Sequence, residues 1–404
     1  MHLTLRSVIE VMTILGVLSS LGFYILSAVG IASFLGARRR KNAAGESAAP
    51  LPPVSILKPL KGIDPNIFEA FCSHCEQDYP EYELIFGVGD LQDPAVEAVR
   101  RLQATYPHRR IELVVCSRDL GTNRKLSTLA QMLPSARYDT LLVNDSDIGV
   151  EPAYLCRVTA PLANPAVGMV TCLYRGIAAP TLGSRLEALG ISTDFVPGVL
   201  SALVIENGLH FGLGSTLVFR RADLQAIGGF EAMLDYLADD YELGHRIAAL
   251  DKRVELSPVV VDTYLPSYSL RAFFDHQLRW ARSVRGARSW GYVGLILTYG
   301  VPWALALLLL SRGAAWAWWL AGLAVFARLA VGMASGLVAL GDSRSMRDLH
   351  LLLLRDLIAP LVWALGLVGN RILWRGDIFY LEEGRLVRPL GASAQPELSH
   401  LPRP

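Results

Sequence analysis

The sequence is poor in several features that would each have assigned it to a class of protein. Its 404 residues include only five cysteines, an odd number that argues for reduced thiols and against a disulfide framework. Neither charge dominates, because 38 basic and 37 acidic residues leave a formal net charge of +1, so we expect no nucleic acid as a partner. The first segment that reads as a strand is followed by "KPLKGIDP", which lacks the G-x-G-x-x-G turn of Rossmann oxidoreductases. Internal repeats and low-complexity tracts are also missing.

Apolar residues, at 52% of the chain, are concentrated at its two ends. Residues 11–36 carry no charge, which exceeds the ~20 residues that a membrane-spanning helix needs. The basic cluster "ARRRK" follows this run instead of preceding it, which disfavours a cleaved signal peptide and places the following chain in the cytoplasm. We therefore predict an N-terminal transmembrane anchor and basic stop over residues 1–41 and a proline-rich linker over residues 42–53. Deletion of residues 1–41 is expected to leave the rest of the chain folded.

The C-terminal third is again apolar. Its uncharged or nearly uncharged runs are residues 291–311, residues 313–341, interrupted only by Arg328, and residues 357–370. We predict transmembrane or re-entrant helices over residues 291–372 and a tail over residues 373–404. One run is expected to be re-entrant or interfacial, because the last has only ~14 residues without a charge and the arginines of the tail favour the cytoplasmic side.

Residues 54–290, between these ends, alternate between two patterns. Short apolar runs are typical of buried strands: "VSILK" (54–58), "ELIFGVGD" (83–90), "IELVVCS" (111–117) and "DTLLVND" (139–145). Helix-like segments separate them at residues 65–75, 93–106 and 125–133, the second with Asp93 as its cap and Pro94 at its first position. This alternation predicts an α/β domain with a mostly parallel sheet, in which ligands bind beyond the carboxyl ends of the strands.

The fourth of these strand-like runs ends in two carboxylates, Asp145 and Asp147, which repel each other unless a cation joins them. Mg²⁺ or Mn²⁺ binds through one or two carboxylates together with substrate phosphates. Aspartates that cap backbone groups in a turn give the same local pattern. Asp90 ends a neighbouring strand, and a second acidic pair, Asp239 and Asp240, opens a helix-like segment, where it also suits the helix dipole. Together these residues favour a metal-diphosphate site over a simple turn.

Five segments in order carry a family resemblance: "ILKPLKGIDP", "FGVGDLQDPA", "VNDSDI", "ADDYELGHRI" and "HQLRW". They resemble the D, DxD, (E/D)D and (Q/R)xxRW signature of family 2-type inverting glycosyltransferases. Within that group the chain is most similar to the ceramide glucosyltransferase family and its bacterial relative, the hopanoid-biosynthesis glycosyltransferase. The resemblance covers about residues 50–290 and implies a GT-A (nucleotide-diphospho-sugar transferase) domain over residues 54–290, flanked by transmembrane helices.

The resemblance also implies a role for each matching residue. Asp240 matches the catalytic base, and Asp239 precedes it in the acidic pair. Nucleotide-sugar contacts are implied for Asp90, Lys125, Asp145, Arg279 and Trp280, and metal contacts for Asp145 and Asp147. The implied cofactor is Mg²⁺ or Mn²⁺. His276 stands where the family usually has Gln or Arg, so the role of that position stays open.

These roles imply a multi-pass enzyme of the inner (plasma) membrane whose catalytic domain faces the cytoplasm. A carboxylate takes the proton of an acceptor hydroxyl as its oxygen attacks the anomeric carbon, and a single displacement inverts an α-linked donor to a β-glycoside. The implied partners are a UDP-sugar donor and a membrane lipid acceptor. We expect transfer of N-acetylglucosamine to a hopanoid polyol or of glucose to ceramide, with diacylglycerol as a further acceptor.

Two stretches bear on a lipid acceptor, and each has an ordinary structural explanation as well. Leu182, Leu186 and Leu189 share one helical face, which suits either a protein core or a lipid site. Residues 271–288 are basic and aromatic, which suits a helix in the lipid headgroup region or an amphipathic surface helix.

Two other functions fit parts of the pattern. A processive polysaccharide synthase shares the aspartates and the RW motif, but its polymer channel needs more membrane helices than three or four apolar runs supply. A non-catalytic membrane sensor or scaffold could keep the nucleotide-binding fold, and UDP-sugar turnover by the purified protein would exclude it.

Overall fold

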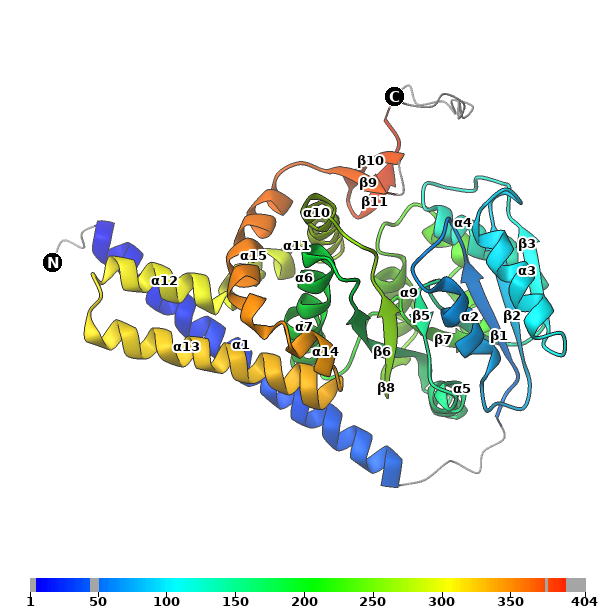
Figure 1. Cartoon of the computed structure of the whole chain (residues 1–404), viewed down its shortest axis with the longest axis horizontal. Helices are drawn as coiled ribbons and strands as arrows, with labels where there is room; N and C mark the ends of the chain where they lie inside the picture. The colour runs from blue at the N-terminus through cyan, green and yellow to red at the C-terminus, as the bar shows by residue number, and fades with distance from the viewer. Residues whose placement is uncertain (1–4, 44–50, 375–376, 390–404) are drawn as a thin grey trace.

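The computed structural model describes residues 5–43, 51–374 and 377–389, and a bundle of apolar helices adjoins its α/β domain (Figure 1). Four helices of the described residues are long and apolar enough to cross a membrane: Ser7–Ala43, Leu182–Ile205, Ala315–Ala339 and Leu349–Leu367. A further candidate is the pair Ser289–Thr298 and Gly300–Leu310, which is bent by 53° at its break. Of the predicted linker, residues 44–50 lie outside the described residues, and helix α1 (Leu5–Ala43) covers its first two positions.

A mixed eight-stranded sheet forms the centre of the α/β domain. Its strands are β1 (Val54–Pro59), β2 (Tyr82–Val88), β3 (Ile111–Val115), β4 (Thr140–Val143), β5 (Ile148–Gly149), β6 (Val167–Ile177), β7 (Leu217–Arg220) and β8 (Arg253–Tyr264). They lie in the order β3-β2-β1-β4-β7-β6-β8-β5. β1 pairs in parallel with β2 and β4, β2 with β3, and β6 with β8, whereas β7 runs antiparallel to β4 and β6. The predicted α/β class with a mostly parallel sheet is therefore confirmed.

The first helices of this domain lie close to their predicted positions. They are α2 (Ile67–Cys75), α3 (Ala95–Thr105) and α4 (Arg124–Met132). Pro94, predicted as the first residue of α3, is instead its cap residue, so Asp93 lies one position before the cap, where it accepts a hydrogen bond of 2.9 Å from the amide of Ala95. The side chain of Asn123 caps α4, at 3.1 Å from the amide of Leu126. Later helices of the domain are α5 (Tyr154–Thr159), α8 (Arg221–Ala226), α9 (Asp239–Ala248) and α10 (Leu270–Ala287).

Helix α1 packs into the molecule along an apolar helix of the α/β domain. That helix consists of α6 (Leu182–Gly190), a π-helical turn (Ile191–Phe195) and α7 (Val196–Ile205). A Cβ added at Gly30 of α1 would lie 2.4 Å from the carbonyl oxygen of Leu200, so the two backbones are in direct contact. Leu186 and Leu189 are fully buried whereas Leu182 is 38% exposed, so two of the three predicted leucines belong to the core.

Arg328, the charge that interrupts the third apolar run, is buried in α13 (Ala315–Met333). Its Nη2 lies 2.7 Å from a carboxylate oxygen of Asp356 in α15 (Leu352–Leu367), and its Nη1 donates to the carbonyl of Thr193 at 2.7 Å. Asp194 joins the same cluster by pairing with both Arg328 and Arg355. The charge is therefore compensated, and it ties two C-terminal helices to the π-helical turn.

A second, three-stranded sheet begins at Arg371, two residues before the predicted tail, and continues into it. Its antiparallel strands are β9 (Arg371–Trp374), β10 (Asp377–Glu382) and β11 (Arg385–Val387). Glu383 and Gly384 join the last two with positive φ angles of 48° and 80°, a combination typical of a two-residue hairpin turn. The remaining elements, α11 (Ser289–Gly294), α12 (Gly300–Leu310) and α14 (Ser343–Met346), precede this sheet. Residues 390–404 of the tail lie outside the described residues.

Candidate active site

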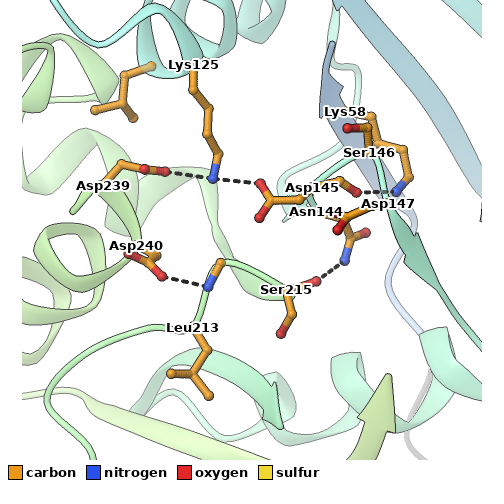
Figure 2. A network of polar contacts seen from close by, with 12 residues as sticks. Lys58, Lys125, Asn144, Asp145, Ser146, Asp147, Leu213, Ser215, Asp239 and Asp240 are labelled. Atoms are coloured by element: carbon orange, nitrogen blue, oxygen red, sulfur yellow. Dashed lines mark hydrogen bonds and ion pairs between the residues drawn. The ribbon is translucent and has the colours of Figure 1, made fainter. Parts of the chain in front are cut away.

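Lys125 links two acidic segments that are far apart in the sequence (Figure 2). From the first turn of α4, its Nζ lies 2.9 Å from Asp145, which follows β4, and 2.9 Å from Asp239, which begins α9. Although burial opposes its charge, Asp145 and Asp239 raise the pKa of Lys125 above its ordinary value. The structure thus brings together the predicted residues Lys125, Asp145 and Asp239 beyond the carboxyl end of β4.

Asp240 lies beside this cluster and is held by backbone amides. Its Oδ2 accepts a hydrogen bond of 2.8 Å from Gly214, and its Oδ1 accepts one of 2.8 Å from Tyr241. A Cβ added at Gly214 would lie 3.2 Å from Oδ2 of Asp240 and 3.3 Å from Oδ2 of Asp145, so both carboxylates approach the same point beside the glycine. Burial and the charge of Asp239 raise the pKa of Asp240 to about 6. A carboxyl group that titrates near neutral pH is suited to general-base catalysis.

The loop that carries Gly214 is fixed to the end of β4 by Asn144 (Figure 2). The Nδ2 of this buried side chain donates to the carbonyl oxygen of Ser215 at 2.6 Å. Its Oδ1 lies 3.1 Å from the Nε2 of His74, which is also buried. The separation between Asp145 and the amide that holds Asp240 is therefore set by a buried polar network.

Asp147 and Asp145 are the candidate ligands for a divalent cation. Burial and the charge of Asp145 raise the pKa of Asp147 to about 6, and the Asp147 Oδ2 accepts a hydrogen bond of 2.6 Å from the hydroxyl of Thr263. Within the described ranges, no group of three or more His, Cys, Asp or Glu residues could hold a metal ion without other ligands. The adjacent carboxylates fit Mg²⁺ or Mn²⁺, since such ions often take only one or two carboxylates and complete their shell with water and substrate phosphates.

Lys58 is a site residue that the sequence analysis missed. It is fully buried at the end of β1, and its Nζ donates to the main-chain oxygen of Asp145 at 3.1 Å (Figure 2). Burial lowers the pKa of Lys58 to about 7, against the opposing effect of Asp147 and Asp145. A lysine at the end of the otherwise apolar run "VSILK" was the signal that could have identified it.

Asp90 occupies a different place from the one we predicted. The expectation that it ends a strand neighbouring that of Asp145 is wrong, because β1 lies between β2 and β4. Asp90 is exposed, and its Oδ1 accepts a hydrogen bond of 2.9 Å from the amide of Gln92 in its own turn. Strand order depends on long-range packing, which local patterns do not record. Lys58, on the intervening strand β1, is the residue that reaches Asp145 and Asp147.

Helix α10 carries Arg279 and Trp280. The ring of Trp280 packs edge-on against Phe195 with 5.7 Å between centroids. The ring of His276, one turn earlier in the same helix, lies 5.6 Å from that of Trp280. The Nδ1 of His276 lies 2.9 Å from the hydroxyl of Tyr268. Burial and the charge of Arg279 lower the pKa of His276 to about 3, so this residue is neutral and serves as a hydrogen-bonding partner of Tyr268.

Known proteins resemble the chain across most of its length. Ceramide glucosyltransferase 3 of Caenorhabditis elegans is 24% identical over 396 residues, which cover 94% of this chain and 84% of the relative. Ceramide glucosyltransferase of Komagataella phaffii is 33% identical over 118 residues, 27% of this chain and 23% of the relative. Among solved structures, the mannosyltransferase PcManGT from Pyrobaculum calidifontis, in complex with GDP-Man and Mn²⁺, has a TM-score of 0.49 and 21% identity over 85% of this chain and 96% of that chain.

The family model of glycosyl transferase family 21 matches residues 16–387. This range includes the acidic cluster, helix α10, the apolar helices and the C-terminal sheet. With the site geometry described above, the match identifies the chain as a glycosyltransferase that belongs to glycosyl transferase family 21.

Proposed function

We propose that the protein transfers a sugar from a UDP-sugar to a hydroxyl of a membrane lipid, with inversion at the anomeric carbon and with Mg²⁺ or Mn²⁺ as cofactor. The observation that carries this proposal is the position of Asp240. Its carboxylate and that of Asp145 both approach one point beside Gly214. A base and a diphosphate-binding carboxylate are therefore close enough together to act on an acceptor oxygen and an anomeric carbon that are being joined.

Asp240 is the proposed general base. It takes the proton of the acceptor hydroxyl as the oxygen bonds to the anomeric carbon, while the bond from that carbon to the diphosphate breaks and UDP leaves. Such a base contributes roughly 10²- to 10⁴-fold to the rate. Asp239 supports it in two ways, because it pairs with Lys125 and its charge helps to raise the pKa of Asp240.

The leaving UDP needs positive charge around its diphosphate. Asp145 and Asp147 would hold the divalent ion, which supplies neutralising charge when it is bound. Lys125 and Arg279 are proposed to offset the remaining negative charge of the diphosphate. Trp280, next to Arg279 in the sequence, is proposed to close the site. Asp90 is proposed to contact the uridine.

Apolar elements beside the site support a lipid acceptor. Trp280 packs on Phe195, which belongs to the apolar helix Leu182–Ile205. The two curated relatives described above are both named ceramide glucosyltransferases. We therefore propose glucose and ceramide, or N-acetylglucosamine and a hopanoid polyol, as the substrate pairs, with diacylglycerol as a third acceptor. The catalytic unit, residues 54–290, is proposed to face the cytoplasm from the inner (plasma) membrane.

The test is UDP release by the full-length protein in detergent. The assay combines UDP-glucose, UDP-galactose or UDP-N-acetylglucosamine with ceramide, diacylglycerol or a hopanoid polyol, in the presence of Mg²⁺ or Mn²⁺. We expect release that depends on one donor and one lipid, together with a β-linked glycolipid product. An α-linked product would contradict inversion.

Asp240→Asn is the decisive variant in this assay. Its amide oxygen can accept the hydrogen bond from Gly214 but its NH2 group cannot accept the one from Tyr241. Losing one hydrogen bond costs roughly 1–3 kcal/mol, so the fold and UDP binding should persist while turnover falls by roughly 10²- to 10⁴-fold. Glu242→Gln, on the same helix, is the control, since Glu242 pairs with Arg246 one turn away. Loss of UDP binding in a folded Asp240→Asn protein would argue against the role as base.

A further inference from the structure

The C-terminal sheet contacts the chain segment that leads into Asp239 and Asp240. The amide of Leu237 donates to the carbonyl of Gly384 at 3.1 Å, and the amide of Leu386 donates to the carbonyl of Asp235 at 2.6 Å. Tyr236 and Arg385 form an antiparallel bridge at the same place. Residues 235–237 therefore pair with β11 through an isolated antiparallel bridge and two backbone hydrogen bonds.

Apolar packing reinforces this pairing. Leu237 is buried and forms a separate hydrophobic cluster with residues of the C-terminal sheet: Ile372, Phe379, Leu381 and Leu386. The cap residue of α9, Ala238, has no side-chain hydrogen bond to the first turn. Since the start of this helix lacks a local cap, its position depends on the tertiary contacts of residues 235–237.

The same segment holds the residues that precede Lys125. The amide of Asn123 donates to the carbonyl of Leu234 at 2.7 Å, and its Nδ2 donates to the carbonyl of Tyr236 at 2.7 Å. The hydroxyl of Thr122 donates to Asp235 at 2.9 Å. Residues 234–237 thus lie between the C-terminal sheet and the start of α4.

The C-terminal sheet is also fixed to the helix of the RW motif, and Figure 1 shows β9, β10 and β11 next to α10. A Cβ added at Gly286 would lie 3.0 Å from the side chain of Leu381 and 3.2 Å from Gly384. The Nη1 of Arg282 donates to the carbonyl of Arg371 at 2.5 Å. The sheet therefore touches α10 and the segment that leads to Asp239, and its Asp377 also pairs with Arg124, next to Lys125, at 3.3 Å.

We propose that the C-terminal sheet, residues 371–387, is a positioning element of the active site. It holds residues 234–237 and thereby sets Asp239 at its distance from Lys125, while the loop of Gly214 holds the neighbouring Asp240 from the other direction. The expected effect of the sheet on turnover rests on the proposed function, whereas its expected effect on the positions of the site residues does not.

The test compares two neighbouring residues of β11 that point in opposite directions. Leu386 is 2% exposed and lies in the cluster with Leu237, whereas Val387 is 39% exposed. Leu386→Asn should release residues 234–237, and Val387→Asn is the matched control. Leu386→Met, which keeps volume and apolar character, should restore wild-type behaviour. If the Asn variant does not fold, Leu386→Ala gives the same comparison with a smaller change.

Amide hydrogen exchange of the full-length variants gives the first measurement, and it needs no substrate. We expect faster exchange over residues 120–126 and 234–242 in Leu386→Asn but not in Val387→Asn. Unchanged exchange in these two segments, with faster exchange confined to residues 371–387, would overturn the proposal. This outcome is read independently of turnover, so it is distinguishable from a failure of the proposed function.

Turnover gives the second measurement. A displacement of about 1 Å at the reacting groups costs on the order of 100-fold, so we expect a loss of kcat of this size in Leu386→Asn. In Val387→Asn the change should stay within about twofold, as for most surface substitutions. UDP-binding stoichiometry, measured in parallel, corrects kcat for unfolded protein. A corrected kcat equal to that of the wild type would refute the positioning role.

Discussion

The backbone amide of Gly214 donates a hydrogen bond of 2.8 Å to Asp240. Because this glycine has no side chain, the carboxylates of Asp240 and Asp145 can both approach the point that a side chain would occupy. A buried Asn144 holds the loop of Gly214 to the end of β4, so the hydrogen bond also fixes Asp240 relative to the central sheet. The proposed base is thus placed by a loop and a strand that lie well before it in the sequence.

Gly214→Ala tests whether this space is used in the reaction. The added methyl group would lie 3.2 Å and 3.3 Å from the two carboxylate oxygens, where the reacting atoms are proposed to meet. We expect the protein to fold and kcat to fall by about 10- to 100-fold, since small displacements at a reacting centre are costly. Gly198→Ala is the control, because a Cβ there meets nothing within 4 Å. Wild-type kcat in folded Gly214→Ala would show that the reaction occurs elsewhere.

The pH dependence of kcat/KM should have an acid limb near the pKa of Asp240. Burial and Asp239 raise that pKa to about 6, and the base must be deprotonated, so activity should be present above this pH and fall below it. Saturating Mg²⁺ or Mn²⁺ keeps Asp147 deprotonated and removes it from the profile. Asp239→Asn takes away a like charge, so the limb should move to lower pH. A limb that does not move would contradict the coupling of the two aspartates.

Asp147→Ala tests the metal site separately from the base. This variant loses one proposed carboxylate ligand but keeps Asp145 with its ion pair to Lys125. In calorimetric titrations of UDP with Mn²⁺ or with EDTA, the wild type should bind more tightly with the metal, and the variant should show little difference. Thr263→Val removes only the hydrogen bond to Asp147 and should have an intermediate effect. Full metal dependence in Asp147→Ala would exclude this residue as a ligand.

Local sequence patterns predicted the elements of the first half of the α/β domain but not their spatial order. The strands before Asp90 and Asp145 formed as expected, because apolar runs and capping residues act over a few positions. That β1 lies between them, which brings Lys58 to the site, depends on packing of the whole sheet. The pairing of Lys125 with Asp239 was likewise not predicted as a contact, although the family resemblance selected both residues.

The C-terminal sheet was missed although a signal for it was present. Apolar residues stand on both sides of Glu383-Gly384 within residues 377–387, with aromatic residues before it, a two-residue hairpin signal. The prediction of a tail over residues 373–404 instead followed from the end of the last apolar run at residue 370. The contacts of the sheet with Leu237 were beyond any local pattern, since the apolar helices separate these two segments in the sequence.

We expected the rest of the chain to fold without residues 1–41, but in the structure α1 packs against the α/β domain. Two glycines of α1 allow this packing to be tested. Tyr24, Ile31 and Phe34 share a hydrophobic core cluster with residues of the α/β domain, so loss of α1 would expose that core. A Cβ at Gly30 would lie 2.4 Å from a backbone oxygen of Leu200, whereas one at Gly22 meets nothing within 4 Å.

Gly30→Ala should therefore force α1 away from α7 and lower the thermal unfolding temperature in detergent. Gly22→Ala should leave that temperature unchanged or raise it, because alanine is favoured over glycine in a helix by about 1 kcal/mol. Both substitutions add the same methyl group to the same helix, so only their different surroundings can separate them. Equal unfolding temperatures for the two variants would mean that contact with α7 contributes little, and that α1 is an independent anchor after all.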